Sequence, residues 1–267
     1  MKTSLIITTY NWPRALNLCL RSAFAQVTKP DEIIIADDGS KTETKNLIDE
    51  LRTQTEIPIV HVWHEDCGFR LCHIRNKAIA ASTADYIIQV DGDTILDPHF
   101  VADHIEVARQ NCFVCGSRVK LEPEVSNSLL SGQIGRPSFF SMPLGYALNS
   151  LRIGPLRSYF ATRYHVDDIQ RLRGSNMAFW RSDVVRVNGF NEDLVQWGHE
   201  DAEFALRLYN SGVQKRALKF GGVQYHIYHK PQSTANEQSH YDAIKNVVEL
   251  RISRCENGID KYLTSKP

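Results

Sequence analysis

The chain has 267 residues, 42% of them hydrophobic, and its 31 basic and 31 acidic residues give a formal net charge of +0. This length is enough for one compact domain of catalytic size, and the balanced charge argues against a nucleic-acid partner held by bulk electrostatics. No apolar run reaches the roughly 18 residues that a membrane span needs, and the N-terminal apolar run is too short for a signal peptide. We therefore expect the six cysteines to be reduced.

The first part of the chain alternates strand-like and helix-like patterns with short connections. Apolar runs predict strands, and apolar residues at helical spacing predict the helices between them. The expected strands cover residues 4–10, 32–37, 57–63 and 85–91, and the expected helices cover 14–26, 42–54 and 71–82. Nearly continuous apolar strands that alternate with helices predict an α/β fold with a parallel sheet covered on both faces.

The regular pattern is lost from 119 to 172. Segment 138–164 mixes aromatic, aliphatic and arginine side chains and is broken by proline and glycine. It is equally typical of an acceptor-binding lid or membrane-touching element and of an insertion packed on the core. Regular elements are expected again after it: a strand over 175–181, a helix over 200–212, a strand pair around 215–228 and a terminal helix near 237–254.

Polar side chains follow three of the expected strands where they end. These strand ends are Thr8–Asn11, Asp37–Ser40 and Asp91–Asp93. Parallel α/β sheets bind ligands outside the carboxyl ends of their strands, so we expect these groups to converge on one edge. No Gly-x-Gly-x-x-Gly or Walker-type motif follows a strand, which disfavours a dinucleotide or P-loop site.

Two carboxylates lie close together in Asp91-Gly92-Asp93. With a glycine between them that lets the backbone bend, they make an oxygen cage suited to Mg²⁺ or Mn²⁺. Asp-Gly is also among the commonest turn dipeptides. The motif alone therefore supports a metal site and an ordinary turn about equally.

A second acidic motif, Trp197-Gly198-His199-Glu200-Asp201, opens the helix expected over 200–212. Acidic residues in the first turn suit the helix dipole, which is a purely structural explanation. The functional explanation is an aromatic wall beside carboxylates, which suits the apolar face and the hydroxyls of a sugar. A carboxylate there can act as a general base on an attacking hydroxyl.

A third motif contains His226 and His229 at the end of a strand-like run. Residues three apart on an extended segment point to opposite faces, so both cannot be ligands on a regular strand. A turn after Tyr228 would allow both to reach one ion. A lone histidine is more often structural, but two beside a candidate acidic metal site favour ligation somewhat.

Seven segments of the chain occur together in a characteristic order. They are IITTYN, ADDGS, GFRLCHIRNKAI, IIQVDGDTILDPHFV, RGSNMAFWR, NGFNEDLVQWGHEDAEFALRLYNSG and QYHIYHK. In this set the chain resembles a family 2 nucleotide-sugar glycosyltransferase of the GT-A fold. It is most similar to bacterial polysaccharide glycosyltransferases and chondroitin or hyaluronan polymerase modules, which share a Trp-Gly-x-Glu-Asp segment with β-1,4-galactosyltransferases.

The resemblance covers nearly the whole chain, with 119–172 the least similar part. It implies a single GT-A domain over 1–267, with a mostly parallel, Rossmann-like sheet flanked by helices. Within it, residues 1–118 would form the nucleotide-sugar-binding half, 119–173 a variable insertion or lid, and 174–267 the acceptor and catalytic half.

The resemblance also implies roles for single residues. Donor contacts would come from Thr8, Tyr10, Asp38, Arg70, Arg75, Asp91, Asn176 and Trp197. Asp93 would bind the metal, Mn²⁺ or Mg²⁺, together with His226, His229 or both. Glu200 would bind the acceptor, and Asp201 would be the catalytic base. An aspartate at position 201, where related retaining enzymes carry asparagine, implies inversion.

The implied function is metal-dependent transfer of Gal, GalNAc, GlcNAc or Glc from a UDP-sugar to a glycan acceptor, in bacterial surface polysaccharide synthesis. The acceptor is expected to be lipid-linked and the protein cytoplasmic, with peripheral contact of 138–173 on the inner face of the membrane. Two alternatives are a sugar-1-phosphate nucleotidylyltransferase and a non-catalytic sugar-nucleotide-binding module. The first would need a glycine-rich N-terminal loop, and residues 8–14 contain no glycine.

Overall fold

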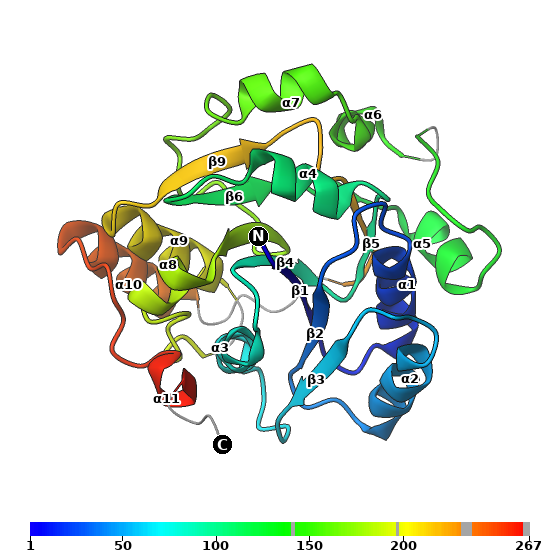
Figure 1. The fold of residues 1–267 in the computed structure, drawn as a ribbon, viewed down its shortest axis with the longest axis horizontal. Helices are drawn as coiled ribbons and strands as arrows, with labels where there is room; N and C mark the ends of the chain where they lie inside the picture. Colours follow the sequence, from blue (N-terminus) through cyan, green and yellow to red (C-terminus); the bar gives the residue numbers. More distant parts are fainter. Residues whose placement is uncertain (140–141, 196–197, 231–236, 264–267) are drawn as a thin grey trace.

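Two sheets form the framework of the protein (Figure 1). The structure, a computed structural model, describes residues 1–139, 142–195, 198–230 and 237–263. The larger sheet has seven strands in the order β3 (Ile59–Trp63), β2 (Glu32–Asp37), β1 (Thr3–Thr9), β4 (Tyr86–Asp91), β8 (Asn176–Trp180), β6 (Cys112–Gly116) and β9 (Gln214–Leu218). The smaller one has the order β5 (Thr94–Leu96), β10 (Gln224–His226) and β7 (Val119–Lys120).

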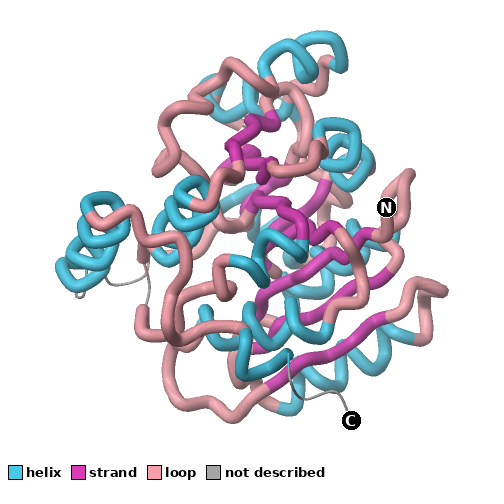
Figure 2. Tube along the Cα trace, turned by 60° about the vertical axis from the view of Figure 1, so that its left-hand side comes forward, coloured by secondary structure: helices cyan, strands magenta, loops and turns pink. Residues whose placement is uncertain are grey.

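Helices cover both faces of the large sheet, as Figures 1 and 2 show. Alternate residues of β1 explain why, because Leu5 and Ile7 pack on one face and Ile6 on the other, all fully buried. The Leu5 face is covered by α1 (Pro13–Phe24), α2 (Thr42–Arg52) and α4 (Phe100–Val107). The Ile6 face is covered by α3 (Leu71–Ala81), α8 (Arg181–Arg186), α9 (Glu200–Asn210) and α10 (Glu237–Glu249). The prediction of an α/β fold with a mostly parallel sheet is confirmed.

The small sheet places the end of β10 beside the turn that follows β4. His226 pairs with Thr94 in the antiparallel ladder between β10 and β5. The next residue, Ile227, donates its backbone N–H to the carbonyl of Asp93 at 2.9 Å. Residues more than 130 positions apart are thereby fixed next to each other. Two strands occur where the strand pair around 215–228 was expected, but they do not pair with each other: β9 pairs with β6 in the large sheet, and β10 belongs to the small one.

The segment after β7 contains α5 (Pro123–Leu130), α6 (Leu144–Ala147) and α7 (Gly154–Phe160), which lie along the edge of the molecule (Figure 1). Two arginines join it to α4. Arg152 pairs with Asp103 at 2.9 Å, and Arg157, which is only 2% exposed, pairs with Asp103 at 2.9 Å and also with Glu106. The insertion is therefore packed on the body of the protein, and these arginines attach it there.

Most predicted elements before 119 are confirmed to within a few residues. The terminal helix α10 ends at Glu249, earlier than expected, and a short α11 (Asp260–Leu263) follows. All six cysteines are free thiols, as predicted. Among the described residues, no helix combines the length and hydropathy that crossing a membrane requires.

Candidate functional site

One edge of the large sheet gathers the polar strand ends. β4 and β6 are both antiparallel to β8, so they run in the same direction, and β1, β2 and β9 run with them. The carboxyl ends of β1, β2, β4, β6 and β9 therefore share an edge with the amino end of β8. Ligands of such sheets bind at this edge, which makes it the candidate site.

Arg75 of α3 lies at the centre of this edge between two carboxylates. It is 2% exposed, and its Nη1 lies 3.0 Å from Glu200 Oε1 while its Nη2 lies 3.6 Å from Asp91 Oδ1. The same oxygen of Asp91 accepts a 2.8 Å hydrogen bond from Thr8 Oγ1. Residues from β1, α3, β4 and α9 are thus linked in one polar network, and a buried arginine balances part of its negative charge.

The Asp91-Gly92-Asp93 turn packs tightly against the end of β1. The N–H of Gly92 donates to the carbonyl of Thr8 at 2.7 Å. A Cβ at position 92 would lie 2.9 Å from that same oxygen, so the close approach of the two strands requires glycine. The turn directs Asp91 toward Arg75 and Asp93 toward the small sheet.

Asp93, His226 and His229 bring their ligand atoms within 4.8 Å of one another. The Oδ2 of Asp93 lies 3.4 Å from His226 Nε2 and 3.2 Å from His229 Nε2, because the chain turns after β10. Burial lowers the pKa of His226 to about 4, which keeps its ring in the neutral, ligating form. The buried Oδ1 of Asp93 has no hydrogen-bond partner among the residues that the structure describes. This donor set, with an unsatisfied buried carboxylate oxygen, fits a divalent cation.

Asp201 lies in the first turn of α9, next to Glu200. Its Oδ2 accepts a 2.7 Å hydrogen bond from the backbone N–H of Gly174, which precedes β8. A Cβ on Gly174 would lie 2.9 Å from the same oxygen. Burial raises the pKa of Asp201 to about 6, and the neighbouring Glu200 carboxylate adds to this effect. A carboxylate with a raised pKa, held in one orientation, suits a general base.

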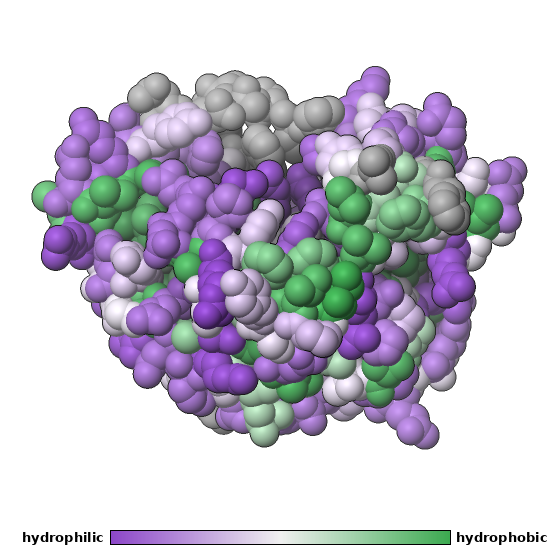
Figure 3. All heavy atoms as spheres, turned by 90° about the horizontal axis from the view of Figure 1, so that it is seen from above, coloured by the Kyte–Doolittle hydropathy of each residue, from purple (hydrophilic) through white to green (hydrophobic). Residues whose placement is uncertain are grey.

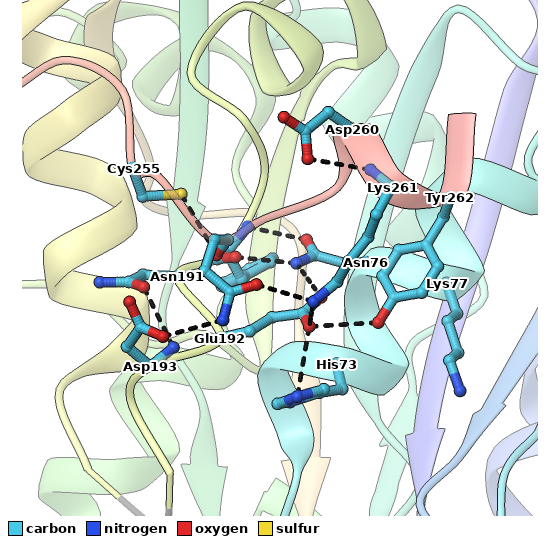
Figure 4. Close-up of polar contacts among 12 residues, drawn as sticks. His73, Asn76, Lys77, Asn191, Glu192, Asp193, Cys255, Asp260, Lys261 and Tyr262 are labelled. Atoms are coloured by element: carbon cyan, nitrogen blue, oxygen red, sulfur yellow. Dashed lines mark hydrogen bonds and ion pairs between the residues drawn. The ribbon is translucent and has the colours of Figure 1, made fainter. Parts of the chain in front are cut away.

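The loop 188–192 and the C-terminal segment fix the position of α3 (Figure 4). The Asn76 amide donates to the carbonyl of Phe190 and to Glu192 Oε1, both at 2.8 Å. The other oxygen of Glu192 contacts Lys261, at 2.6 Å, and Tyr262, at 3.1 Å. Since Asn76 follows Arg75, this network sets the direction in which the arginine projects.

The end of β2 carries Asp38, one of the residues expected to contact the donor. Its Oδ1 lies 2.7 Å from His64 Nε2, and its Oδ2 accepts the backbone N–H of Arg70 at 3.0 Å. Tyr10, which is 52% exposed, donates its hydroxyl to Asp66 at 2.9 Å. These side chains lie at the β1–β2 part of the edge. The carboxylates of Asp38 and Asp66 are hydrogen-bonded to other groups of the protein.

Asn176, the first residue of β8, is fully buried. Its Oδ1 lies 2.9 Å from His104 Nε2, and its Nδ2 donates to the carbonyls of Ser117 and Gly222 at 2.6 and 2.9 Å. In this structure its amide joins three segments of the protein and is closed off from solvent. Trp197, the expected aromatic wall, lies outside the described residues.

The structure therefore brings together most of the expected residues: Thr8, Arg75, Asp91, Asp93, Glu200, Asp201, His226 and His229. Sequence reasoning did not single out Gly174, which holds Asp201, or His64, which holds Asp38. The N–H of Gly174 is a backbone group, and no side-chain pattern could have indicated its role.

Two family comparisons agree with this geometry. Residues 4–168 match glycosyl transferase family 2, and residues 157–230 match the N-terminal domain of galactosyltransferase. Among curated proteins, the chain is 26% identical over 257 residues to the chondroitin synthase of Escherichia coli, which covers 88% of this chain and 35% of that protein. It is 25% identical over 248 residues to the chondroitin synthase of Pasteurella multocida, covering 88% of this chain and 25% of the relative. The chain thus spans about a third or less of these relatives.

Solved structures share the fold at low sequence identity. A crystal structure of Staphylococcus aureus TarS 1–349 has a TM-score of 0.65 at 15% identity, over 98% of this chain and 68% of the other. The mannosyltransferase PcManGT from Pyrobaculum calidifontis, in complex with GDP-Man and Mn²⁺, has a TM-score of 0.62 at 18% identity, over 94% of this chain and 64% of the other. TarS 1–349 has also been solved with UDP and with UDP-GlcNAc.

Proposed function

The chain belongs to glycosyl transferase family 2 and has the GT-A fold, and from this premise we propose that it transfers a hexose or N-acetylhexosamine from a UDP-sugar to a glycan hydroxyl, with inversion. One observation carries the proposal: the Asp93–His226–His229 cluster and the half-buried carboxylate of Asp201 lie at the same edge of the sheet. Departure of the diphosphate is helped by a bound cation, and attack by the hydroxyl is helped by a base. The same edge of the sheet offers a group for each.

The donor nucleotide is assigned to the β1–β2 part of the edge, near Thr8, Tyr10, Asp38 and Arg70. TarS and PcManGT bind nucleotides or nucleotide sugars, which supports this class of donor. In this assignment residues 1–118 supply most donor contacts, and 174–267 supply the acceptor side and the base.

Asp93, His226 and His229 would hold the metal ion. A divalent cation bound by them would offset the negative charge that develops on the departing diphosphate. Mg²⁺ binds mainly through oxygen ligands, so two imidazole nitrogens favour Mn²⁺.

Asp201 would take the proton of the acceptor hydroxyl as that oxygen attacks the anomeric carbon. The attacking oxygen forms the new glycosidic bond, the bond to the UDP oxygen breaks, and the proton stays on Asp201 until it exchanges with solvent. The Gly174 N–H binds one oxygen of the base, which fixes its orientation. Glu200, held by Arg75, would accept a hydrogen bond from an acceptor hydroxyl. In-line attack on an α-linked donor gives a β-glycoside.

The test is a panel of UDP-Gal, UDP-GalNAc, UDP-GlcNAc and UDP-Glc, each measured for binding and for UDP release with and without Mn²⁺. Binding to the folded protein raises its apparent thermal stability, so one donor should raise the melting temperature in a Mn²⁺-dependent manner and release UDP. Formation of a nucleotide sugar from a sugar phosphate would instead support a nucleotidylyltransferase. Binding without any UDP release, even with acceptors present, would support a non-catalytic module.

We further propose that the acceptor is a lipid-linked glycan, encountered at the inner face of a bacterial cytoplasmic membrane. Figure 3 shows hydrophobic residues gathered on the face formed by α6 and α7. Exposed hydrophobic side chains on this segment, outside the cavity beside it, are Leu148, Ile153, Leu156 and Tyr159. Because Arg152 and Arg157 are paired with acids of α4, these apolar groups, rather than the arginines, would face the lipid.

Sedimentation with phospholipid vesicles tests the membrane contact. The wild-type protein should bind vesicles, and the double variant Leu156→Glu/Tyr159→Glu should not. Val27→Glu, at a position 61% exposed in a different part of the surface, is the control. Failure of the wild-type protein to bind, or equal binding of all three proteins, would contradict the contact.

A further inference from the structure

A cavity of about 300 Å³ opens at the same sheet edge, beside β6 and β9. Its walls come from the turn between β6 and β7, the end of β9 and the insertion that precedes β8. Six cationic side chains line it, here called the basic pocket: Arg118, Lys120, Arg171, Arg173, Lys215 and Lys219. No aspartate or glutamate is among its described lining residues. Its volume is at the lower end of the range for ligand pockets.

The positive charge of the basic pocket meets carboxylates at a distance, Asp91 with Arg118 and Asp168 with Lys215, and, among the described residues, not in ion pairs. None of the six side chains forms an ion pair with a carboxylate in the described part of the chain. Elsewhere, by contrast, the buried arginines Arg75, Arg157 and Arg207 are all paired with acids. Burial lowers the pKa of Lys219, as expected for an ammonium group without a carboxylate partner. A cluster of cations without direct carboxylate partners is suited to binding an anion from outside.

The six cations divide into those that build the wall and those that are available to a ligand. Lys215 donates to the backbone carbonyls of His165, Asp168 and Arg171 at 3.1, 2.7 and 2.7 Å, so it holds the wall in place. The guanidinium groups of Arg171 and Arg173 are exposed and have only neutral partners. The buried Nε of Arg118 has no hydrogen-bond partner within the described ranges of the chain. Planar guanidinium donors are suited to a carboxylate or a phosphate.

The basic pocket lies on the acceptor side of the proposed base. Across the large sheet, the donor strands β2 and β1 are followed by β4, which leads to Asp93. Next come β8 and then β6 and β9, which border the pocket. Arg173 directly precedes Gly174, whose N–H binds Asp201. In the large sheet β4 and β8 therefore lie between the pocket and the donor strands, and in the small sheet the pocket residue Lys120 pairs with His226, so the pocket borders both the base and the metal cluster.

We propose that the basic pocket binds an anionic group of the acceptor, a sugar carboxylate or a phosphate, close to the hydroxyl that is glycosylated. Tyr146 and Tyr164 also line the pocket and offer aromatic faces for the sugar that carries the group. This inference rests on the proposed function and adds the chemical class of the acceptor.

Matched acceptors test the proposal. The first pair is an oligosaccharide that contains a hexuronate and the same compound with its carboxyl group reduced to an alcohol. The second pair is a glycosyl phosphate and its dephosphorylated form, which distinguishes phosphate from carboxylate. Each is measured by transfer kinetics and, without donor, by calorimetric binding. The proteins are wild type, Lys120→Gln/Arg171→Gln, and Arg163→Gln, a control on the same insertion that does not line the pocket.

At least one anionic acceptor should have a kcat/KM about tenfold or more above its neutral partner, since hydrogen bonds to charged groups are stronger than those between neutral groups. The double variant should lose that preference, and Arg163→Gln should behave as wild type. Equal use of anionic and neutral acceptors by an enzyme that releases UDP would overturn the inference but not the proposed function. If no donor is used at all, calorimetry still decides: anion binding that the double variant abolishes supports the pocket, and its absence refutes it.

Discussion

Arg75 lies 3.0 Å from Glu200, and both side chains are almost completely buried. Removing the arginine alone would leave the carboxylates of Glu200 and Asp91 without their counter-charge. We predict that Arg75→Met lowers the free energy of unfolding by about 3 kcal/mol, because an uncompensated buried charge is costly. Denaturant titration measures the change. In the double variant Arg75→Met/Glu200→Gln part of the loss should be recovered; a purely additive double variant would show that the two residues are not coupled.

The raised pKa of Asp201 predicts a pH-dependent stability. Its folded-state pKa is about 6, above the usual value of about 3.9 in an unfolded chain, so the folded state holds the proton more tightly. The proton on Asp201 therefore stabilises the folded state; this contribution is fully present below pH ~4 and is lost as the pH rises through about 6. At pH 7 the variant Asp201→Asn, which removes the buried charge, should therefore be more stable than wild type by up to ~2 kcal/mol.

Unfolding curves at pH 4 and pH 7 check this prediction. The difference in stability between wild type and Asp201→Asn should be small at the lower pH and larger at the higher one. A variant that is less stable than wild type at pH 7 would show that the carboxylate is favourably placed when ionised.

Gly174 should be required for activity more than for folding. The Cβ of an alanine would lie 2.9 Å from the Asp201 oxygen, so the base must move. Displacement of a catalytic group by about 1 Å can cost roughly 100-fold, and we expect Gly174→Ala to lower kcat by about this factor with little change in donor affinity. Gly135→Ala, where no atom lies within 4 Å of the new Cβ, is the matched control and should keep wild-type kcat.

Metal binding should depend on Asp93. Addition of Mn²⁺ should raise the melting temperature of the wild-type protein, because the ion binds the folded state. Asp93→Asn and His226→Ala should each remove most of that increase. Asp49→Asn changes an exposed acid on α2 and should leave it intact. A Mn²⁺ response that survives Asp93→Asn would place the ion elsewhere.

The sequence predicted the strands and helices up to residue 91 well, since these are periodic or continuously apolar, but α4 and β6 were not among the expected elements. Short elements such as β5 and β7 have too few residues to show a period. The pairing of β10 with β5 is a contact between distant segments, and no local pattern could reveal it. For the same reason the sequence left open whether the chain turns after Tyr228; in the structure it does, and His229 lies beside Asp93.

The same contrast between local pattern and long-range contact applies to the site residues. The acidic groups at strand ends were predictable because topology places those ends together. The pairing of Arg75 with Glu200 joins residues 125 positions apart, and the unpaired charge of the basic pocket collects residues from 118 to 219. Both depend on packing in three dimensions, which the one-dimensional pattern does not contain.

The central claim is that Asp201 is the base of an inverting transfer reaction. The most direct measurement compares wild type and Asp201→Asn for sugar transfer and for donor binding in the same buffer with Mn²⁺. We predict that transfer falls by about 1,000-fold or more, while the dissociation constant of the UDP-sugar changes by less than about threefold, because a base acts in the transition state. Transfer by Asp201→Asn at the wild-type rate would contradict the account.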